Sequence, residues 1–297
     1  MTRIILAYSG SPATSHAIGW LTHTHAAEVV TLTLDLGQGR RLEAVRDRAL
    51  ATGASRAHVL DVYDEFAHEY FLRALRADAL FANAQSLVGA LSHPLLARKL
   101  VDMAGIEQAD AVAFACSSGD ARIVRAIREL RRDITAIPVP RTTFAGQTIR
   151  SQTTIEHPSE PALVEITFER GAPVAINAIP MPLIDLVSSL DIIAAAHGVG
   201  RFEGLETPAA TVLSAAHRAV EDGGASHDVS PRYAAMIESG RWFSSEREEL
   251  DAVVARAQER VAGVVRLKLF QGGREIVDRR EPTSSEVWRL TPSRSSV

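Results

Sequence analysis

A loop of small hydroxyl residues near the N-terminus constrains the fold more than any other feature of this sequence. The apolar segment 3–6 before the loop has the character of a short buried strand, and residues 15–24 after it predict a helix. Backbone N–H groups at the start of a helix point into such a loop, and the helix dipole favours an anion there. We therefore expect an α/β protein that holds a phosphate group between Ser9 and Ser15. The alternative is an ordinary strand-to-helix turn with a Thr or Ser side chain as N-cap.

Strand-like and helix-like segments alternate through the first half of the chain. The expected strands cover 3–6, 28–34, 57–62, 111–115 and 134–137, and the expected helical segments cover 15–24, 41–52, 64–104 and 121–132. This alternation predicts a Rossmann-like, doubly wound parallel sheet with right-handed crossovers. Ligands bind such sheets at the carboxyl ends of the strands. Ser9, Gly37 and Ser117 all follow strands, so we expect three loops to converge on one crevice.

The composition changes near residues 138–140, and the second half predicts an α+β region. Residues 141–162 are polar and rich in Thr, Ser and Pro, which is typical of a linker. The expected strands beyond it are 163–169, 174–177, 264–270 and 274–279, with a turn at 171–173, and the expected helices are 182–197, 209–221, 232–240 and 244–261. We therefore predict a nucleotide-binding domain at 1–140, a linker at 141–162 and a second domain at 163–297.

Charge and composition exclude several classes of protein. The formal net charge is −4, so there is no basic excess to neutralise nucleic-acid phosphates. No apolar run is long enough to predict a membrane-spanning helix, and no signal-peptide pattern precedes the first strand. The single cysteine, Cys116, excludes an internal disulfide and fits a reducing compartment. We expect a cytoplasmic protein with neither nucleic acid nor membrane as a partner.

Motifs spread in one order along nearly the whole chain resemble those of a single enzyme family. Ser9, Gly10, Thr14 and Ser15 fit the pyrophosphate loop Ser-Gly-Gly-x-Asp-Ser/Thr-Ser of ATP-pyrophosphatases. Further matching segments are 33–39, 92–100, 168–174, 197–201, 206–211 and 258–263. Together they resemble the argininosuccinate synthase family. The resemblance implies an adenine nucleotide alpha-hydrolase-like fold followed by a synthetase and multimerisation domain with a C-terminal helix.

The resemblance also implies a reaction and a set of site residues. The family joins citrulline to aspartate in arginine biosynthesis, using ATP with Mg²⁺ and releasing AMP and pyrophosphate, and it assembles as a homotetramer. The residues implied to bind the nucleotide and its pyrophosphate are Ala7, Tyr8, Ser9, Gly10, Ser11, Thr14, Ser15 and Leu34. Those implied to bind the amino-acid substrates are Ser117, Asp120, Arg122 and Ser151. No metal ligand is predicted among the side chains.

Several positions depart from the family pattern. In the phosphate loop, Ser11 stands in place of the second glycine, Pro12 lacks an N–H, and Ala13 replaces the aspartate. At the implied citrulline site, the positions of two family tyrosines are occupied here by Gln85 and Leu205, and the position of a hydroxyl residue is occupied by Gly89. The segment between 201 and 206 and the loop 142–154 are short. We expect a ligase with weakened activity or altered substrates; the alternative is a catalytically inactive paralogue that partners an active synthase or binds an anion.

Overall fold

The computed structural model describes residues 2–37, 42–115, 120–139, 158–202, 205–221 and 226–281. The chain forms two compact units, and neither is continuous in sequence. The first unit comprises 1–66, 89–151 and 236–247, and the second comprises 67–88, 152–235 and 248–297. Within the described ranges, no helix combines the length and apolar character that crossing a bilayer requires.

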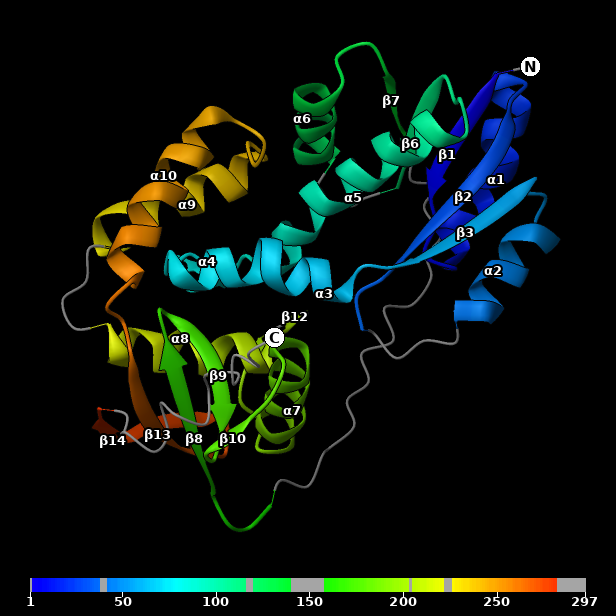
Figure 1. Cartoon of the computed structure of the whole chain (residues 1–297). Helices are drawn as coiled ribbons and strands as arrows, with labels where there is room; N and C mark the ends of the chain where they lie inside the picture. The colour runs from blue at the N-terminus through cyan, green and yellow to red at the C-terminus, as the bar shows by residue number, and fades with distance from the viewer. Residues whose placement is uncertain are drawn as a thin grey trace, which may run out of the picture. The chain divides into compact units, whose positions relative to one another are not determined.

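The first unit contains the predicted parallel sheet (Figure 1). Its strands are β1 (Arg3–Ala7), β2 (Glu28–Asp35), β3 (Arg56–Asp61), β6 (Ala111–Phe114) and β7 (Thr135–Pro138). Its helices are α1 (Pro12–His25), α2 (Leu42–Ala51), α3 (Tyr63–Glu65), α5 (Val88–Ile106) and α6 (Asp120–Leu130). The strand order is β3-β2-β1-β6-β7, and every pair is parallel. The direction of winding reverses between β1 and β6, which makes this position the topological switch point.

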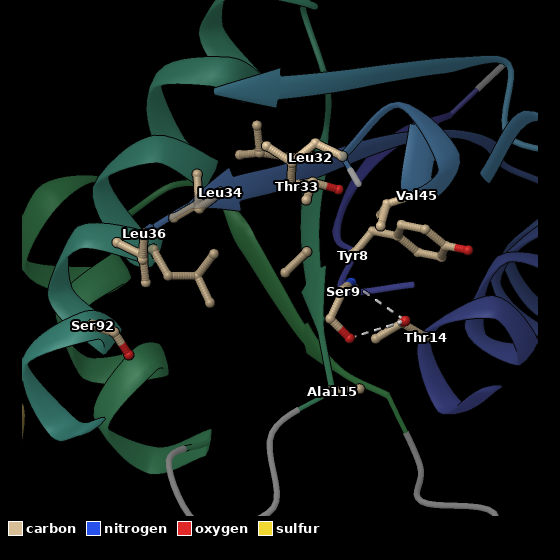
Figure 2. A pocket seen from close by; sticks show the side chains of 13 residues that line it. Tyr8, Ser9, Thr14, Leu32, Thr33, Leu34, Leu36, Val45, Ser92 and Ala115 are labelled. Carbon is tan, nitrogen blue, oxygen red and sulfur yellow. Dashed lines mark hydrogen bonds between the residues drawn. The ribbon is translucent and has the colours of Figure 1, made fainter. Parts of the chain in front are cut away.

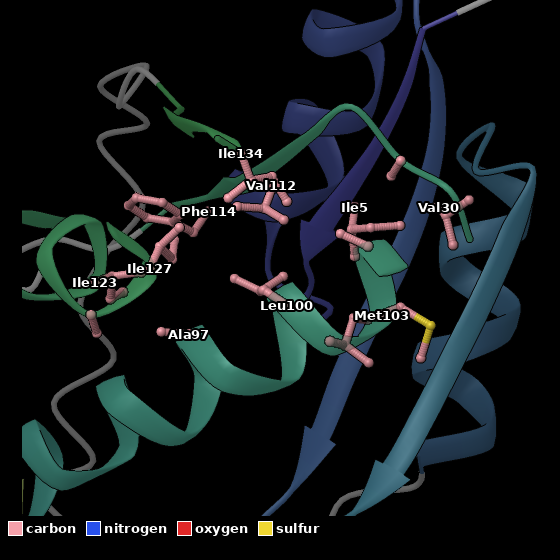
Figure 3. Close-up of a cluster of buried hydrophobic side chains, with 14 residues drawn as sticks. Ile5, Val30, Ala97, Leu100, Met103, Val112, Phe114, Ile123, Ile127 and Ile134 are labelled. Carbon is pink, nitrogen blue, oxygen red and sulfur yellow. The ribbon is translucent and has the colours of Figure 1, made fainter. Parts of the chain in front are cut away.

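Both faces of this sheet are covered by helices, as the prediction of a doubly wound sheet requires. Successive side chains of a strand point to opposite faces. Ile4 and Leu6 of β1 therefore pack with residues of α1, whereas Ile5 packs with residues of α5 and α6. Figure 3 shows the second of these clusters, with Phe114 and Ile127 among its buried side chains. The apolar faces of the helices thus fix where the strand ends lie.

The second unit is built on an antiparallel sheet. Its sheet strands are β8 (Ala162–Glu169), β9 (Ala172–Ile176), β10 (Ile179–Pro180), β13 (Gly263–Phe270) and β14 (Gly273–Arg280), in the order β10-β9-β8-β13-β14. Its other elements are η1 (Phe66–Phe71), α4 (Leu72–Arg76), β4 (Phe81–Ala82), β5 (Gln85–Ser86), α7 (Leu183–Ala196), β11 (Arg201–Phe202), β12 (Leu205–Glu206), α8 (Pro208–Val220), α9 (Ser226–Ser239) and α10 (Ser245–Gln258). The end of α9 and the start of α10 belong to the first unit. Helix α8 contacts β13, and α7 contacts β9. The predicted α+β character of this region is confirmed.

Three details of the sequence prediction were wrong. The helical segment 64–104 is interrupted by the hairpin of β4 and β5, whose turn residues Asn83 and Ala84 both have positive φ, 47° and 64°. The turn predicted at 171–173 lies one residue earlier, at Arg170 and Gly171, where φ is 47° and 70°. Helix α9 begins at Ser226 rather than at residue 232, with Pro231 inside it.

Candidate functional site

A cavity of about 190 Å³ opens at the carboxyl ends of β1 and β2 (Figure 2). Predicted nucleotide-site residues on its wall are Ala7, Tyr8, Ser9, Thr14 and Leu34. Its further wall residues are Leu32, Thr33, Leu36, Leu42, Val45, Ser92, Leu96 and Ala115. The wall is thus mostly aliphatic with a few hydroxyl groups, which is the usual make-up of a small-molecule site. Ala115 directly follows β6, so the cavity also lies beside the topological switch point.

The hydroxyl groups of the loop before α1 form one cluster. Thr14 Oγ1 lies 3.4 Å from Ser9 Oγ and 3.1 Å from Ser11 Oγ, and the two serine oxygens are 3.1 Å apart. Ser11 is the N-cap of α1, and its Oγ accepts a hydrogen bond from the Thr14 N–H. Hydroxyl groups can donate as well as accept, so this cluster can turn toward an anion by rotating its O–H bonds.

The remaining loop residues shape the turn and do not line the cavity. Gly10 has φ +73°, a conformation that favours glycine, and an added Cβ would lie 3.3 Å from both methyl carbons of Val45. Ser15 lies one turn into the helix, and its Oγ is 2.9 Å from the buried Tyr8 hydroxyl. Pro12 occupies the first helical turn, where its missing N–H leaves no intrahelical bond unmade. The loop thus serves as an N-capped helix start as well as a wall of the cavity.

Only part of the predicted amino-acid site lies within the described residues. Ser117 and Ser151 lie outside them, and Asp120 is described only as the first residue of α6. Arg122 Nε donates to the Glu238 carbonyl at the end of α9, at 2.6 Å. Close packing supports this contact, because a Cβ on Gly240 would lie 2.7 Å from the Arg122 Cα. In this structure Arg122 therefore stabilises the carboxyl end of a helix.

Two neighbouring residues of α5 differ in their chemistry. Ser92 lines the cavity, and its Oγ donates to the Gly89 carbonyl at 2.8 Å. Burial, reinforced by the positive charge of Arg122, lowers the pKa of His93 from 6.5 to about 4. His93 is therefore neutral at pH 7, and it adds no positive charge beside the site.

Sequence reasoning missed much of the apolar wall. Leu32 and Leu34 lie near the end of β2 and Leu36 directly follows the strand, yet only Leu34 was predicted as a site residue. Ser92 and Leu96 lie in the segment 92–100, which matches the family pattern but was not predicted to line the site. Their four-residue spacing on a helix was the available signal, because it places both side chains on one face.

The described side chains bear on whether the site could hold Mg²⁺. They contain no group of three His, Cys, Asp or Glu residues that could hold a metal ion. The first turn of α1 carries no acidic residue, since Ala13 occupies the implied aspartate position. Mg²⁺ in nucleotide sites is often bound largely by substrate phosphates and water. The described part of the site fits an ion that arrives with the nucleotide better than a resident ion.

Comparison with known proteins agrees with the geometry. The family model described as Arginosuccinate synthase N-terminal HUP domain matches residues 3–157, and the Arginosuccinate synthase C-terminal domain matches residues 147–289. Argininosuccinate synthase of Geobacillus kaustophilus (strain HTA426) is 33% identical over 354 residues, which cover 95% of this chain and 87% of the relative. Argininosuccinate synthase of Oleidesulfovibrio alaskensis (strain ATCC BAA-1058 / DSM 17464 / G20) is 34% identical over 356 residues, with 95% and 89% coverage.

A third relative shows the same pattern. Argininosuccinate synthase of Rhizorhabdus wittichii (strain DSM 6014 / CCUG 31198 / JCM 15750 / NBRC 105917 / EY 4224 / RW1) is 31% identical over 359 residues, covering 94% of this chain and 88% of the relative. These alignments are longer than the 297-residue chain, so the relatives contain segments without a counterpart here. Both domain models and the near-complete coverage lead to one conclusion: the chain belongs to the argininosuccinate synthase family.

Proposed function

We propose that this protein is an ATP-dependent, AMP-forming carbon–nitrogen ligase of the argininosuccinate synthase type. The observation that carries the proposal is the cavity at the ends of β1 and β2, because its wall includes Ser9, Thr14 and Leu34 of the implied nucleotide site. The aliphatic wall suits the adenosine part of ATP, and the start of α1 suits its phosphates. Mg²⁺ would enter with ATP and neutralise phosphate charge.

In the family reaction, ATP adenylates the ureido oxygen of citrulline and pyrophosphate leaves. The aspartate amine then attacks the ureido carbon, AMP leaves, and a new carbon–nitrogen bond forms. The protein's contribution is to bind and orient the reactants and to stabilise developing negative charge. Here the loop hydroxyls and the N–H groups at the start of α1 would hold the leaving pyrophosphate.

The proposal for the amino-acid substrates follows from residues in which this chain departs from the family pattern. The proposed amino-acid ligands are Ser117, Asp120, Arg122 and Ser151. Gln85, Gly89 and Leu205 occupy positions where the family pattern has tyrosine or hydroxyl residues, so we propose weakened citrulline turnover or a different amino-acid substrate. In this proposal residues 1–140 bind nucleotide, 163–297 form the synthetase and multimerisation domain, and the protein acts in the cytoplasm as a homotetramer.

A specific observation favours a second candidate function. The hydroxyls of Ser9, Ser11 and Thr14 hydrogen-bond one another, and Arg122 Nε is engaged by a helix carbonyl. A ligand must displace or reorient these contacts before it can use the groups. The second candidate is therefore a catalytically inactive paralogue that binds an anion or assembles with an active synthase.

Product analysis separates the two candidates. The protein is incubated with Mg·ATP, citrulline and aspartate, and AMP, pyrophosphate and argininosuccinate are quantified by mass spectrometry, with each substrate omitted in turn. Equal amounts of all three products support the family reaction. AMP and pyrophosphate formed only with another amino-acid pair support altered substrates. No AMP from folded protein with any pair supports the inactive paralogue. Ser9→Ala should slow product formation, whereas the exposed Ser159→Ala serves as its matched control.

A further inference from the structure

An arginine on α2 contacts the main chain of the phosphate loop. Arg48 Nη1 donates to the carbonyl oxygen of Gly10 at 2.8 Å, although 38 residues separate the two in sequence. One turn earlier on the same helix, Val45 packs against Gly10 and also lines the cavity. Helix α2 therefore contacts the loop through one apolar side chain and one charged donor.

The hydrogen bond fixes the direction of the next N–H group. In a trans peptide the C=O of one residue and the N–H of the following residue point in opposite directions. The described residues contain no cis peptide bond, so holding the Gly10 carbonyl also sets the orientation of the Ser11 N–H. Gly10 has φ +73°, and glycine is the residue with the widest choice of backbone angles. A contact at this position therefore restricts the most adaptable point of the loop.

The charge of the donor matters as well as its position. The oxygen of a backbone carbonyl carries partial negative charge, which repels a phosphate group that approaches the loop. A guanidinium hydrogen-bonded to that oxygen offsets this charge, and charge-assisted hydrogen bonds are stronger than neutral ones.

We infer that Arg48 is a positioning residue that holds the phosphate loop of this protein in its anion-binding conformation. The inference rests on the proposed function in so far as the anion is the triphosphate of ATP. Arg48 acts through the Gly10 main chain, and it is absent from the cavity wall. Its loss should therefore weaken nucleotide binding without removing a direct ligand.

The test compares three variants of the full chain. Arg48→Met removes the charge and the donor but keeps the aliphatic stem, and Arg48→Lys restores one charged donor. Arg46→Met is the matched control, because Arg46 lies on the same helix with 51% of its side chain exposed and pairs with the adjacent Asp47. Hydrogen exchange of a peptide spanning residues 8–15 reports loop order, and calorimetric titration with Mg·ATP reports affinity.

We expect Arg48→Met to exchange faster in this peptide and to bind Mg·ATP roughly tenfold more weakly, with partial recovery in Arg48→Lys and wild-type behaviour in Arg46→Met. Unchanged exchange and affinity in Arg48→Met, or equal losses in Arg46→Met, would overturn the inference. If the wild-type protein binds no ATP, the proposed function fails, and hydrogen exchange then decides by itself whether Arg48 holds the loop.

Discussion

Replacing His93 with glutamine should remove part of the acid sensitivity of this protein's stability. Burial and the nearby charge of Arg122 lower the pKa of His93 to about 4, against 6.5 in the unfolded chain. Between these two values the unfolded chain binds the proton more readily than the folded protein does. The free energy of unfolding therefore falls as the pH drops from 6.5 toward 4, and no such loss arises above pH 6.5.

The size of the effect follows from the pKa difference. One pKa unit corresponds to about 1.4 kcal/mol, so the loss due to His93 is about 2 kcal/mol at pH 5 and approaches about 3 kcal/mol below pH 4. A loss of this size is a large part of the stability of an ordinary domain. Carboxylates also titrate in this pH range, but both proteins contain them. The difference in the free energy of unfolding between His93→Gln and wild type therefore reports the contribution of His93 alone.

Urea denaturation at several pH values between about 7.5 and 5 measures this difference. At pH 7.5 His93→Gln can be less stable than wild type, because a neutral buried side chain has been exchanged. As the pH falls, its disadvantage should shrink by about 2 kcal/mol. The control His23→Gln replaces an exposed imidazole and corrects for the removal of a histidine. A constant difference between His93→Gln and wild type across this range would refute the reasoning.

Three further substitutions test the fold around the site and away from it. Ser11→Ala should lower the free energy of unfolding by about 1 kcal/mol, because α1 loses its N-cap; equal denaturation midpoints would contradict this. Gly171→Ala should lower the free energy of unfolding by about 2–4 kcal/mol, since φ is +70° and the new Cβ would clash with Oε1 of the buried Gln258 side chain; a loss below 1 kcal/mol would contradict the packing. Glu107→Gln should lower the free energy of unfolding by about 1–3 kcal/mol, because the buried carboxylate binds Arg56 at 3.0 Å. Disappearance of this difference in 1 M salt would contradict the assignment to a buried contact.

The sheet of the first unit could be predicted because its strands carry strong local signals. The run of β-branched and leucine residues in 28–34 and the alternation of strands with helices predicted a parallel doubly wound sheet, which the structure confirms. The strand order β3-β2-β1-β6-β7 was not predicted and comes from the structure. The hairpin at Phe81–Ser86 could not be predicted in the same way. Its strands are two residues long, too short for any period, and its Asn-Ala turn lacks the glycine that usually signals such a turn.

The candidate site was predictable where it is local and not where it depends on tertiary contacts. Ser9 and Thr14 belong to one strand–loop–helix motif, so their proximity follows from the sequence. Arg48 lies on α2 and Gly10 lies in the loop before α1, so their contact joins two segments that no short sequence motif contains. The resemblance implies that Arg122 binds an amino-acid substrate, whereas the contact of its Nε with the Glu238 carbonyl depends on tertiary packing that only the structure shows.

Calorimetric titration with Mg·ATP tests the central claim, that the cavity at the ends of β1 and β2 binds the nucleotide. The informative variant is Thr14→Val, which keeps the shape of a buried cavity residue and removes its hydroxyl. Thr22→Val is its matched control, since Thr22 lies exposed on the same helix. We predict saturable binding to the wild type and to Thr22→Val, and affinity lower by roughly tenfold in Thr14→Val. No binding by folded wild-type protein at millimolar Mg·ATP, or equal affinity in all three proteins, would contradict the claim.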